Sequence, residues 1–130
     1  MAVETEKKTK VLLIDDEPSF TRLLRLNLEK TGAYEVREEN KGSHGFETAL
    51  QFKPDIILLD IIMPDIDGGT VVSQLRSSEQ LQNTTVLFLT AVLSKRETHE
   101  KIGLLSSIPS IAKPVSAQEV IYFIERYTRK

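Results

Sequence analysis

Short runs of branched apolar residues alternate along the chain with segments whose apolar residues recur at helical spacing. The clearest runs are Val11–Ile14 and Ile56–Leu59, which are apolar at every position and end at aspartates. Such runs are typical of strands buried on both faces of a parallel sheet. The pattern predicts five strands, at residues 11–14, 34–37, 56–59, 85–89 and 110–112.

A helical segment follows each predicted strand, and the second of these helices is predicted at residues 43–52. Pro18 suits the first turn of the first helix, and Gly32 is a candidate for the position just after its end. Capping-box patterns, in which a Ser precedes a Glu by three positions, open the last two helices at Ser94 and Ser116. The helices bury apolar residues that include, in chain order, Leu24, Ala49, Val72, Ile102 and Val120.

Alternation of strands and helices predicts right-handed crossovers and a parallel sheet with helices on both faces. The expected fold is therefore an α/β (βα)5 doubly wound, five-stranded sandwich. Residues 1–9 are polar and charged and are expected to form a flexible lead-in. Residues 10–130 are expected to form one domain, because nothing in the sequence indicates an internal linker.

Composition narrows the possible functions. The chain has 130 residues, a formal net charge of −2 and no cysteine. The small net charge argues against direct nucleic-acid binding, and the lack of cysteine excludes disulfides and thiolate sites. No apolar run approaches the roughly 18 residues of a membrane span, and the N-terminus lacks the apolar core of a signal peptide. The expected location is the cytoplasm, with no membrane partner.

Polar residues follow four of the predicted strands, at the edge where ligands bind in open α/β sheets. They are Asp15 and Asp16, Asp60, Thr90 and Lys113. A single aspartate at a strand end is usually a turn residue or a helix cap. The combination is more informative, because this fold brings the four segments together.

Three neighbouring carboxylates repel one another, so that either a pKa rises or a cation binds. Oxygen ligands without His or Cys favour a hard ion such as Mg²⁺. Thr90 and Lys113 are suited to binding a phosphoryl group, and an aspartate carboxylate can itself attack phosphorus. The residues therefore indicate a site that accepts a phosphoryl group.

These residues stand in segments that resemble the receiver domain of two-component response regulators, the chemotaxis-regulator-like family. The similarity extends over residues 10–127 and is carried by residues 12–17 (LLIDDE), 58–68 (LLDIIMPDIDG), 89–91 (LTA) and 113–114 (KP). It implies the flavodoxin-like strand order 2-1-3-4-5. It also implies a cis peptide bond between Lys113 and Pro114.

The resemblance assigns a role to each site residue. Asp60 would accept a phosphoryl group from a phosphohistidine of a sensor histidine kinase or histidine phosphotransfer protein. Asp16, Asp60 and the backbone carbonyl of Ile62 would bind Mg²⁺ (or Mn²⁺) directly, and Asp15 would bind it through water. Thr90 would supply the switch hydroxyl, and Lys113 would pair with the phosphoryl group. The protein would be a signalling phosphoacceptor, not an enzyme in the usual sense, with slow autodephosphorylation.

The chain departs from the family pattern at Ser110, where an aromatic residue is common, so the switch at that face is expected to differ. Ile62 and Val92 are apolar at positions that border the phosphorylated carboxylate in the family, which predicts slow dephosphorylation. The downstream target is either another protein or an output domain that this chain does not contain.

Two other functions remain open. A degenerate receiver would act as a docking module without phosphorylation. A haloacid dehalogenase-type phosphatase would need an Asp-x-Asp motif, whereas Asp15 and Asp16 are adjacent.

Overall fold

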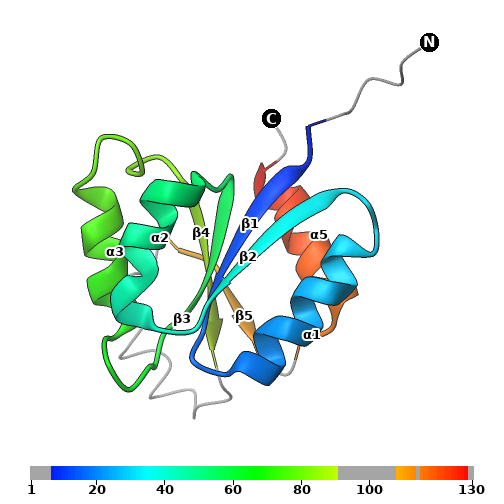
Figure 1. Ribbon diagram of the computed structural model, residues 1–130, viewed down its shortest axis with the longest axis horizontal. Helices are drawn as coiled ribbons and strands as arrows, with labels where there is room; N and C mark the ends of the chain where they lie inside the picture. Colours follow the sequence, from blue (N-terminus) through cyan, green and yellow to red (C-terminus); the bar gives the residue numbers. More distant parts are fainter. Residues whose placement is uncertain (1–6, 91–107, 114, 129–130) are drawn as a thin grey trace.

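The computed structural model describes residues 7–90, 108–113 and 115–128. Its centre is a five-stranded parallel sheet in the order β2-β1-β3-β4-β5 (Figure 1). The strands are β1 (Thr9–Ile14), β2 (Tyr34–Glu39), β3 (Ile56–Asp60), β4 (Thr85–Thr90) and β5 (Ser110–Ala112). The predicted parallel sheet and its strand order are therefore confirmed.

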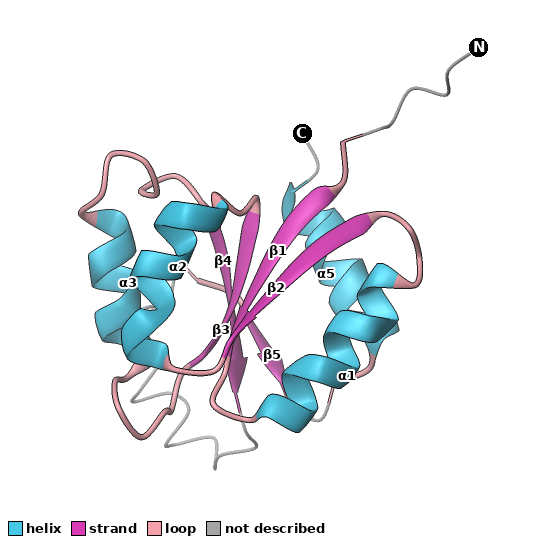
Figure 2. Cartoon of the chain, in the orientation of Figure 1, coloured by secondary structure: helices cyan, strands magenta, loops and turns pink. Residues whose placement is uncertain are grey.

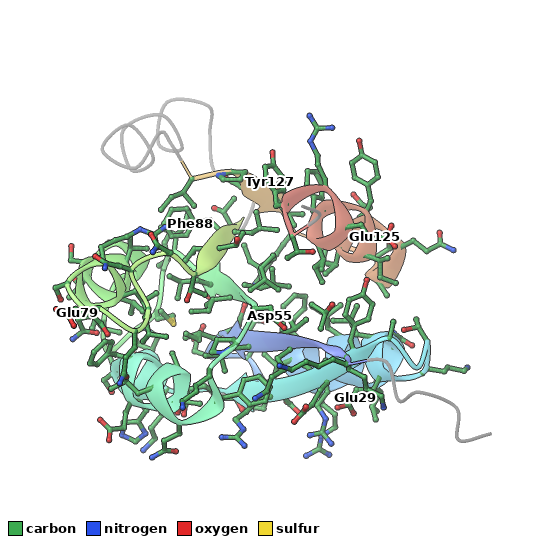
Figure 3. The ribbon with its side chains drawn as sticks, turned by 90° about the horizontal axis from the view of Figure 1, so that it is seen from above. Glu29, Asp55, Glu79, Phe88, Glu125 and Tyr127 are labelled. Atoms are coloured by element: carbon green, nitrogen blue, oxygen red, sulfur yellow. The ribbon has the colours of Figure 1, made fainter. Side chains whose placement is uncertain are left out.

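Helices cover both faces of the sheet (Figures 1 and 2). They are α1 (Pro18–Glu29), α2 (Gly45–Phe52), preceded by the 3-10 turn η1 (Gly42–His44), α3 (Gly68–Arg76) and α5 (Ala117–Thr128). Helices α1 and α5 lie on one face, and α2 and α3 lie on the other, as the view from above also shows (Figure 3). None of the helices in the described segments is long and apolar enough to span a bilayer.

The continuous apolar strands are explained by this layering. Successive side chains of a strand point to opposite faces. In β1, Leu12 and Ile14 pack in the core on the α2 and α3 side, whereas Val11 and Leu13 pack in the core on the α1 and α5 side. All four side chains are fully buried. Burial on both faces fixes the strands and therefore the positions of the residues that follow them.

Strand β2 is longer than the sequence pattern predicts. It was expected to end at Arg37, but it pairs with β1 as far as Glu39, opposite Ile14. As an edge strand it carries exposed or half-buried charged residues, which hide the strand signal in the sequence. The polar residue after its true end is Asn40.

Two helix boundaries also differ from expectation. The predicted helix 43–52 is divided, because Gly42–His44 forms a 3-10 turn before α2 begins at Gly45. Gly32 was expected directly after the C-cap of α1, but the C-cap is Lys30, so Gly32 lies one position further on. Its φ of 81° is in the left-handed region, where glycine is favoured.

The capping box at the start of α5 is present as predicted. The backbone N–H of Glu119 donates to Ser116 Oγ (3.1 Å), and the backbone N–H of Ser116 donates to Glu119 Oε1 (3.1 Å). The second predicted box, at Ser94 and Glu97, and its helix lie outside the described residues. The expected cis bond at Pro114 and the position of Val92 lie outside them as well.

Replacing Ser116 with alanine tests the capping box. Ser116→Ala removes the acceptor for the Glu119 N–H, and loss of such a cap costs about 1 kcal/mol. The free energy of unfolding, measured by urea titration, is therefore expected to fall by about that amount. Ser73→Ala is the control, because Ser73 is exposed within α3. Equal stability of Ser116→Ala and the parent would contradict the assignment.

Candidate functional site

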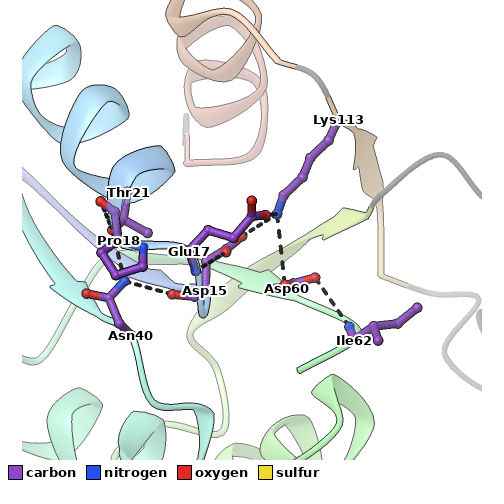
Figure 4. Close-up of polar contacts among 8 residues, drawn as sticks. All are labelled: Asp15, Glu17, Pro18, Thr21, Asn40, Asp60, Ile62 and Lys113. Carbon is purple, nitrogen blue, oxygen red and sulfur yellow. Dashed lines mark hydrogen bonds and ion pairs between the residues drawn. The ribbon is translucent and has the colours of Figure 1, made fainter. Parts of the chain in front are cut away.

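The carboxyl edge of the sheet gathers the polar residues predicted from the sequence. Oxygens of Asp15, Asp16 and Asp60 all lie within 4.8 Å of one another. Lys113 follows β5, and its ammonium reaches the same place (Figure 4). Thr90 is the buried last residue of β4, and its carbonyl accepts a backbone hydrogen bond from Lys113 (2.7 Å). The four strand ends therefore meet as the sheet topology predicts.

Asp60 ends β3 and is only 5% exposed. Its Oδ1 accepts a hydrogen bond from the backbone N–H of Ile62 (3.2 Å), which orients the carboxylate. Helix α3 begins against the backbone of this residue, since a Cβ at Gly68 would lie 2.8 Å from the Asp60 carbonyl oxygen. Only glycine allows this close approach. Asp67 caps the helix by accepting from the Thr70 N–H (2.9 Å).

Asp15 is fully buried beside Asp60. Its Oδ2 lies 2.6 Å from Lys113 Nζ, and its Oδ1 accepts from the backbone N–H of Glu17 (3.0 Å). Asp16 is the half-buried member of the acidic group. The group therefore combines two deeply buried carboxylates with one that is partly open to solvent.

Lys113 lies closer to Asp15 than to Asp60, whose Oδ2 is 3.9 Å away from Nζ. A third carboxylate, that of Glu17, approaches Nζ to 3.1 Å. The ammonium also lies over the ring of Phe20, 4.6 Å from its centroid, in a cation–π contact. Glu17 and Phe20, at the start of α1, thus hold Lys113 on the Asp15 side of the site.

Burial and charge shift the pKa values of this cluster. Burial, followed by the negative charge of Asp15, raises the pKa of Asp60 to about 7, although Lys113 and the Ile62 N–H oppose the shift. Burial also raises the pKa of Asp15. For Lys113, burial favours a lower pKa, but its contacts with Asp15 and Asp60 outweigh burial and raise the pKa. The site therefore holds more negative charge than its single ammonium neutralises.

A divalent cation fits this environment. All three donors are carboxylates, as hard cations prefer, and burial together with the negative charge of Asp15 raises the pKa of Asp60. The partly exposed Asp16 leaves room for the waters that Mg²⁺ keeps in half-open sites. Asp15, Asp16 and Asp60 are therefore the residues that could hold a metal.

Three residues near the site were not predicted from the sequence. Glu17 and Phe20 contact Lys113, and the Asn40 side chain donates to the backbone carbonyl of Asp15 (2.8 Å). The strand-end rule would have included Asn40 if the end of β2 had been placed correctly. No comparable signal in the sequence marks Phe20, which lies in the first turn of α1.

Comparison with known proteins agrees with this geometry. The model of the response regulator receiver domain family matches residues 11–125. RpaA of Synechocystis sp., a DNA-binding dual master transcriptional regulator, is 34% identical over 123 residues, which are 93% of this chain and 49% of RpaA. PhoP of Bacillus subtilis, an alkaline phosphatase synthesis transcriptional regulatory protein, is 39% identical over 113 residues, covering 85% of this chain and 45% of PhoP.

Solved structures show the same architecture. The receiver domain of the Francisella response regulator 1452 has a TM-score of 0.77 at 26% identity, covering 94% of this chain and 98% of that one. The chemotaxis protein CheY4 of Vibrio cholerae superposes with a TM-score of 0.81, covering 92% and 98% of the two chains. Its identity of 24% supports the fold alone.

The fold and the acidic edge define a signalling module of the receiver type and not a classical enzyme. The chain belongs to the response regulator receiver domain family. It spans about half the length of the curated relatives it matches.

The raised pKa of Asp60 predicts how stability changes with pH in metal-free solution. The folded protein binds a proton at Asp60 more tightly than the unfolded chain does, so this group lowers stability as pH rises from about 4 through about 7. Asp60→Asn removes the buried charge and is expected to be more stable than the parent at pH 8, by a few kcal/mol at most. The difference should shrink as pH falls toward 4.

Thermal or urea unfolding in EDTA across this pH range measures the effect. Asp65→Asn is the matched control, because the backbone N–H of Ser43 donates to this exposed carboxylate and lowers its pKa. That group stabilises the fold at high pH, so its variant should not gain stability at pH 8. A stability difference between Asp60→Asn and the parent that does not change with pH would refute the charge argument.

Proposed function

We propose that this chain is a phosphorylation-dependent signalling switch, in which Asp60 accepts a phosphoryl group from a phosphohistidine. The donor would be a sensor histidine kinase or a histidine phosphotransfer protein. The observation that carries the proposal is the placement of Asp60, a buried strand-end carboxylate that lies beside two further carboxylates and has Lys113 Nζ 3.9 Å from its Oδ2. Family membership supports it.

The proposed reaction is a displacement at phosphorus. A carboxylate oxygen of Asp60 forms the new P–O bond while the P–N bond of the phosphohistidine breaks, and the electron pair goes to the imidazole nitrogen. The attacking carboxylate must be ionised, which the pKa of about 7 alone would achieve only partly at neutral pH. A bound Mg²⁺ (or Mn²⁺) would supply the positive charge that favours the ionised form and stabilises the transferring phosphoryl group.

The site residues take the following roles in this proposal. Asp16, Asp60 and the Ile62 carbonyl bind the metal directly, and Asp15 binds it through water. Lys113 is already 3.9 Å from Asp60 and pairs with the phosphoryl oxygens. The Thr90 hydroxyl, at the end of the neighbouring strand, bonds to the same group and shifts the population toward an active conformation.

The switch would act on a protein target or on an output domain. The relatives RpaA and PhoP are named as transcriptional regulators and are about twice the length of this chain. We propose a cytoplasmic setting, in which the described domain itself contacts neither nucleic acid nor membrane. Ser110 begins β5 at the position where an aromatic switch residue is common, so the output face is expected to respond through other side chains.

The phosphoacceptor assignment is tested with acetyl phosphate or phosphoramidate and Mg²⁺. The parent is expected to gain one acid-labile phosphoryl group, detected by intact mass, whereas Asp60→Asn gains none. Asp65→Asn is the control, since its carboxylate is exposed in the loop that follows β3. Equal, acid-stable labelling of Asp60→Asn would refute the assignment. A parent that never labels would favour the docking-module hypothesis, and continued turnover of the donor would favour a phosphatase.

Ile62 is expected to slow the loss of the phosphoryl group. Its side chain is 44% exposed, and its backbone N–H is bonded to Asp60, so it borders the approach of water to the acyl phosphate. Ile62→Asn offers a hydrogen bond to that water, worth about 1 kcal/mol, and should speed decay by a factor of about five. Decay after donor removal measures this.

Leu26→Asn is the control for this change. It is the same type of substitution, and Leu26 is exposed on α1 and is not one of the site residues. Its decay should equal that of the parent. Decay in Ile62→Asn that is equal to or slower than that of the parent would refute this prediction.

A further inference from the structure

A chain of hydrogen bonds joins α1 and the end of β2 to the backbone carbonyl of Asp15, which precedes Asp16 in the turn after β1 (Figure 4). Asn40 Nδ2 donates both to the carbonyl of Asp15 (2.8 Å) and to Thr21 Oγ1 (2.9 Å). Thr21 Oγ1 lies 2.7 Å from Glu38 Oε1, and Arg25 binds the other oxygen of that carboxylate (2.9 Å). The four side chains of this chain of bonds, those of Asn40, Thr21, Glu38 and Arg25, are not part of the acidic group that could hold a metal.

The direction of each bond follows from its chemistry. The Thr21 hydroxyl has one hydrogen, and its shortest contact is the Glu38 carboxylate, which only accepts. The hydroxyl oxygen is then free to accept from Asn40. Asn40 must direct its NH₂ group toward the Asp15 carbonyl, because its amide oxygen there would face another acceptor. The hydroxyl hydrogen could also point to the Pro18 carbonyl (3.2 Å), and in both cases Thr21 Oγ1 accepts from Asn40. The side chains of Thr21 and Asn40 therefore form a clamp in which the Asn40 amide has one possible orientation.

This clamp acts on the peptide bond that carries Asp16. The carbonyl of Asp15 and the amide of Asp16 belong to one planar unit, so a bond to the former fixes the direction of the latter. The backbone N–H of Asp15 is bonded to the carbonyl of Glu39 (3.1 Å), so the end of β2 holds Asp15 from both sides. Thr21 is fully buried, where a hydrogen bond is stronger than in water.

The clamp opposes a specific force. The three carboxylates of the acidic group repel one another, and Asp16, the least buried, has the most freedom to turn away. If Asp16 turned away, a metal ion would have to draw it back, and part of the binding free energy would be lost. Holding the turn in advance avoids that loss, as in other preorganised sites.

We propose that Thr21 and Asn40 are positioning residues that hold the Asp15–Asp16 peptide in its metal-binding orientation before the cation arrives. The inference rests on the proposed function in that it takes the acidic group to be a Mg²⁺ site. It goes further by assigning the affinity of that site in part to two residues that touch neither the metal nor the phosphoryl group.

Thr21→Val tests the clamp, because it keeps the shape of the side chain and removes the hydroxyl. The affinity for Mg²⁺, measured by titration calorimetry at fixed pH and ionic strength, is expected to fall about fivefold, which corresponds to one hydrogen bond. The rise in melting temperature on adding excess Mg²⁺ should be smaller than in the parent. Thr21→Ser keeps the hydroxyl and should restore both values.

Thr48→Val is the matched control. Thr48 Oγ1 donates to Glu39 Oε1 (2.6 Å), so the same change removes a hydroxyl–carboxylate bond at the neighbouring residue of β2. No described bond links Thr48 to the Asp15 carbonyl. This variant should lose stability in EDTA and in Mg²⁺ alike, and its affinity for Mg²⁺ should equal that of the parent.

Parental Mg²⁺ affinity in Thr21→Val, or an equal loss in Thr48→Val, would overturn the inference. If Thr21→Val does not fold, Asn40→Ala is the alternative variant, because Asn40 is half-buried. It is expected to show the same loss of Mg²⁺ affinity, and parental affinity would overturn the inference. A parent that binds no Mg²⁺ and takes no phosphoryl group would instead overturn the proposed function.

Discussion

Repulsion between the buried carboxylates of Asp15 and Asp60 is the constraint on which the rest of this structure depends. One ammonium, that of Lys113, lies 2.6 Å from Asp15 and 3.9 Å from Asp60, and it does not balance the charge of both carboxylates. Such a cluster persists only where the surrounding backbone is rigid. The five strands supply that rigidity, because apolar layers on both faces leave the ends of the buried strands little freedom to separate.

The same repulsion makes the site responsive. When a cation binds beside a carboxylate whose charge is poorly compensated, or when that carboxylate is phosphorylated, the electrostatic repulsion at the site decreases. Asp60, with its pKa raised by burial and by Asp15, is in that condition in the metal-free protein. The unfavourable electrostatics of the metal-free site and its capacity to respond to a cation or a phosphoryl group therefore have the same cause, which is the placement of Asp15 beside Asp60.

Most of the fold could be predicted because strands buried on both faces give continuous apolar runs. The exception is instructive: β2 lies at the edge, its exposed positions are charged, and its end was placed two residues too early. Boundaries of α2 were missed for a related reason, since the 3-10 turn at Gly42 is set by tertiary packing. There, a Cβ would lie within 3 Å of Met63 and Ile66.

The sequence predicted the residues of the candidate site that stand at the ends of correctly placed strands. Asp15 and Asp60 stand at the ends of strands buried on both faces, Lys113 follows the short edge strand β5, and the topology brings the three residues together. Asn40 was missed because it follows the strand with the misplaced end. Glu17 and Phe20 were missed because side-chain conformations in the first turn of α1, which no spacing rule specifies, direct them to Lys113.

The backbone hydrogen bond from Lys113 to the carbonyl of Thr90 has a mechanical consequence. The two residues leave adjacent strands side by side, with Thr90 opposite Ala112 in the register. A displacement of the Thr90 main chain toward the centre of the site must pull the main chain of Lys113 with it, or break a bond of 2.7 Å. The main chains that carry the Thr90 hydroxyl and the Lys113 ammonium are therefore coupled, whereas rotations about the side-chain bonds of either residue leave this hydrogen bond intact.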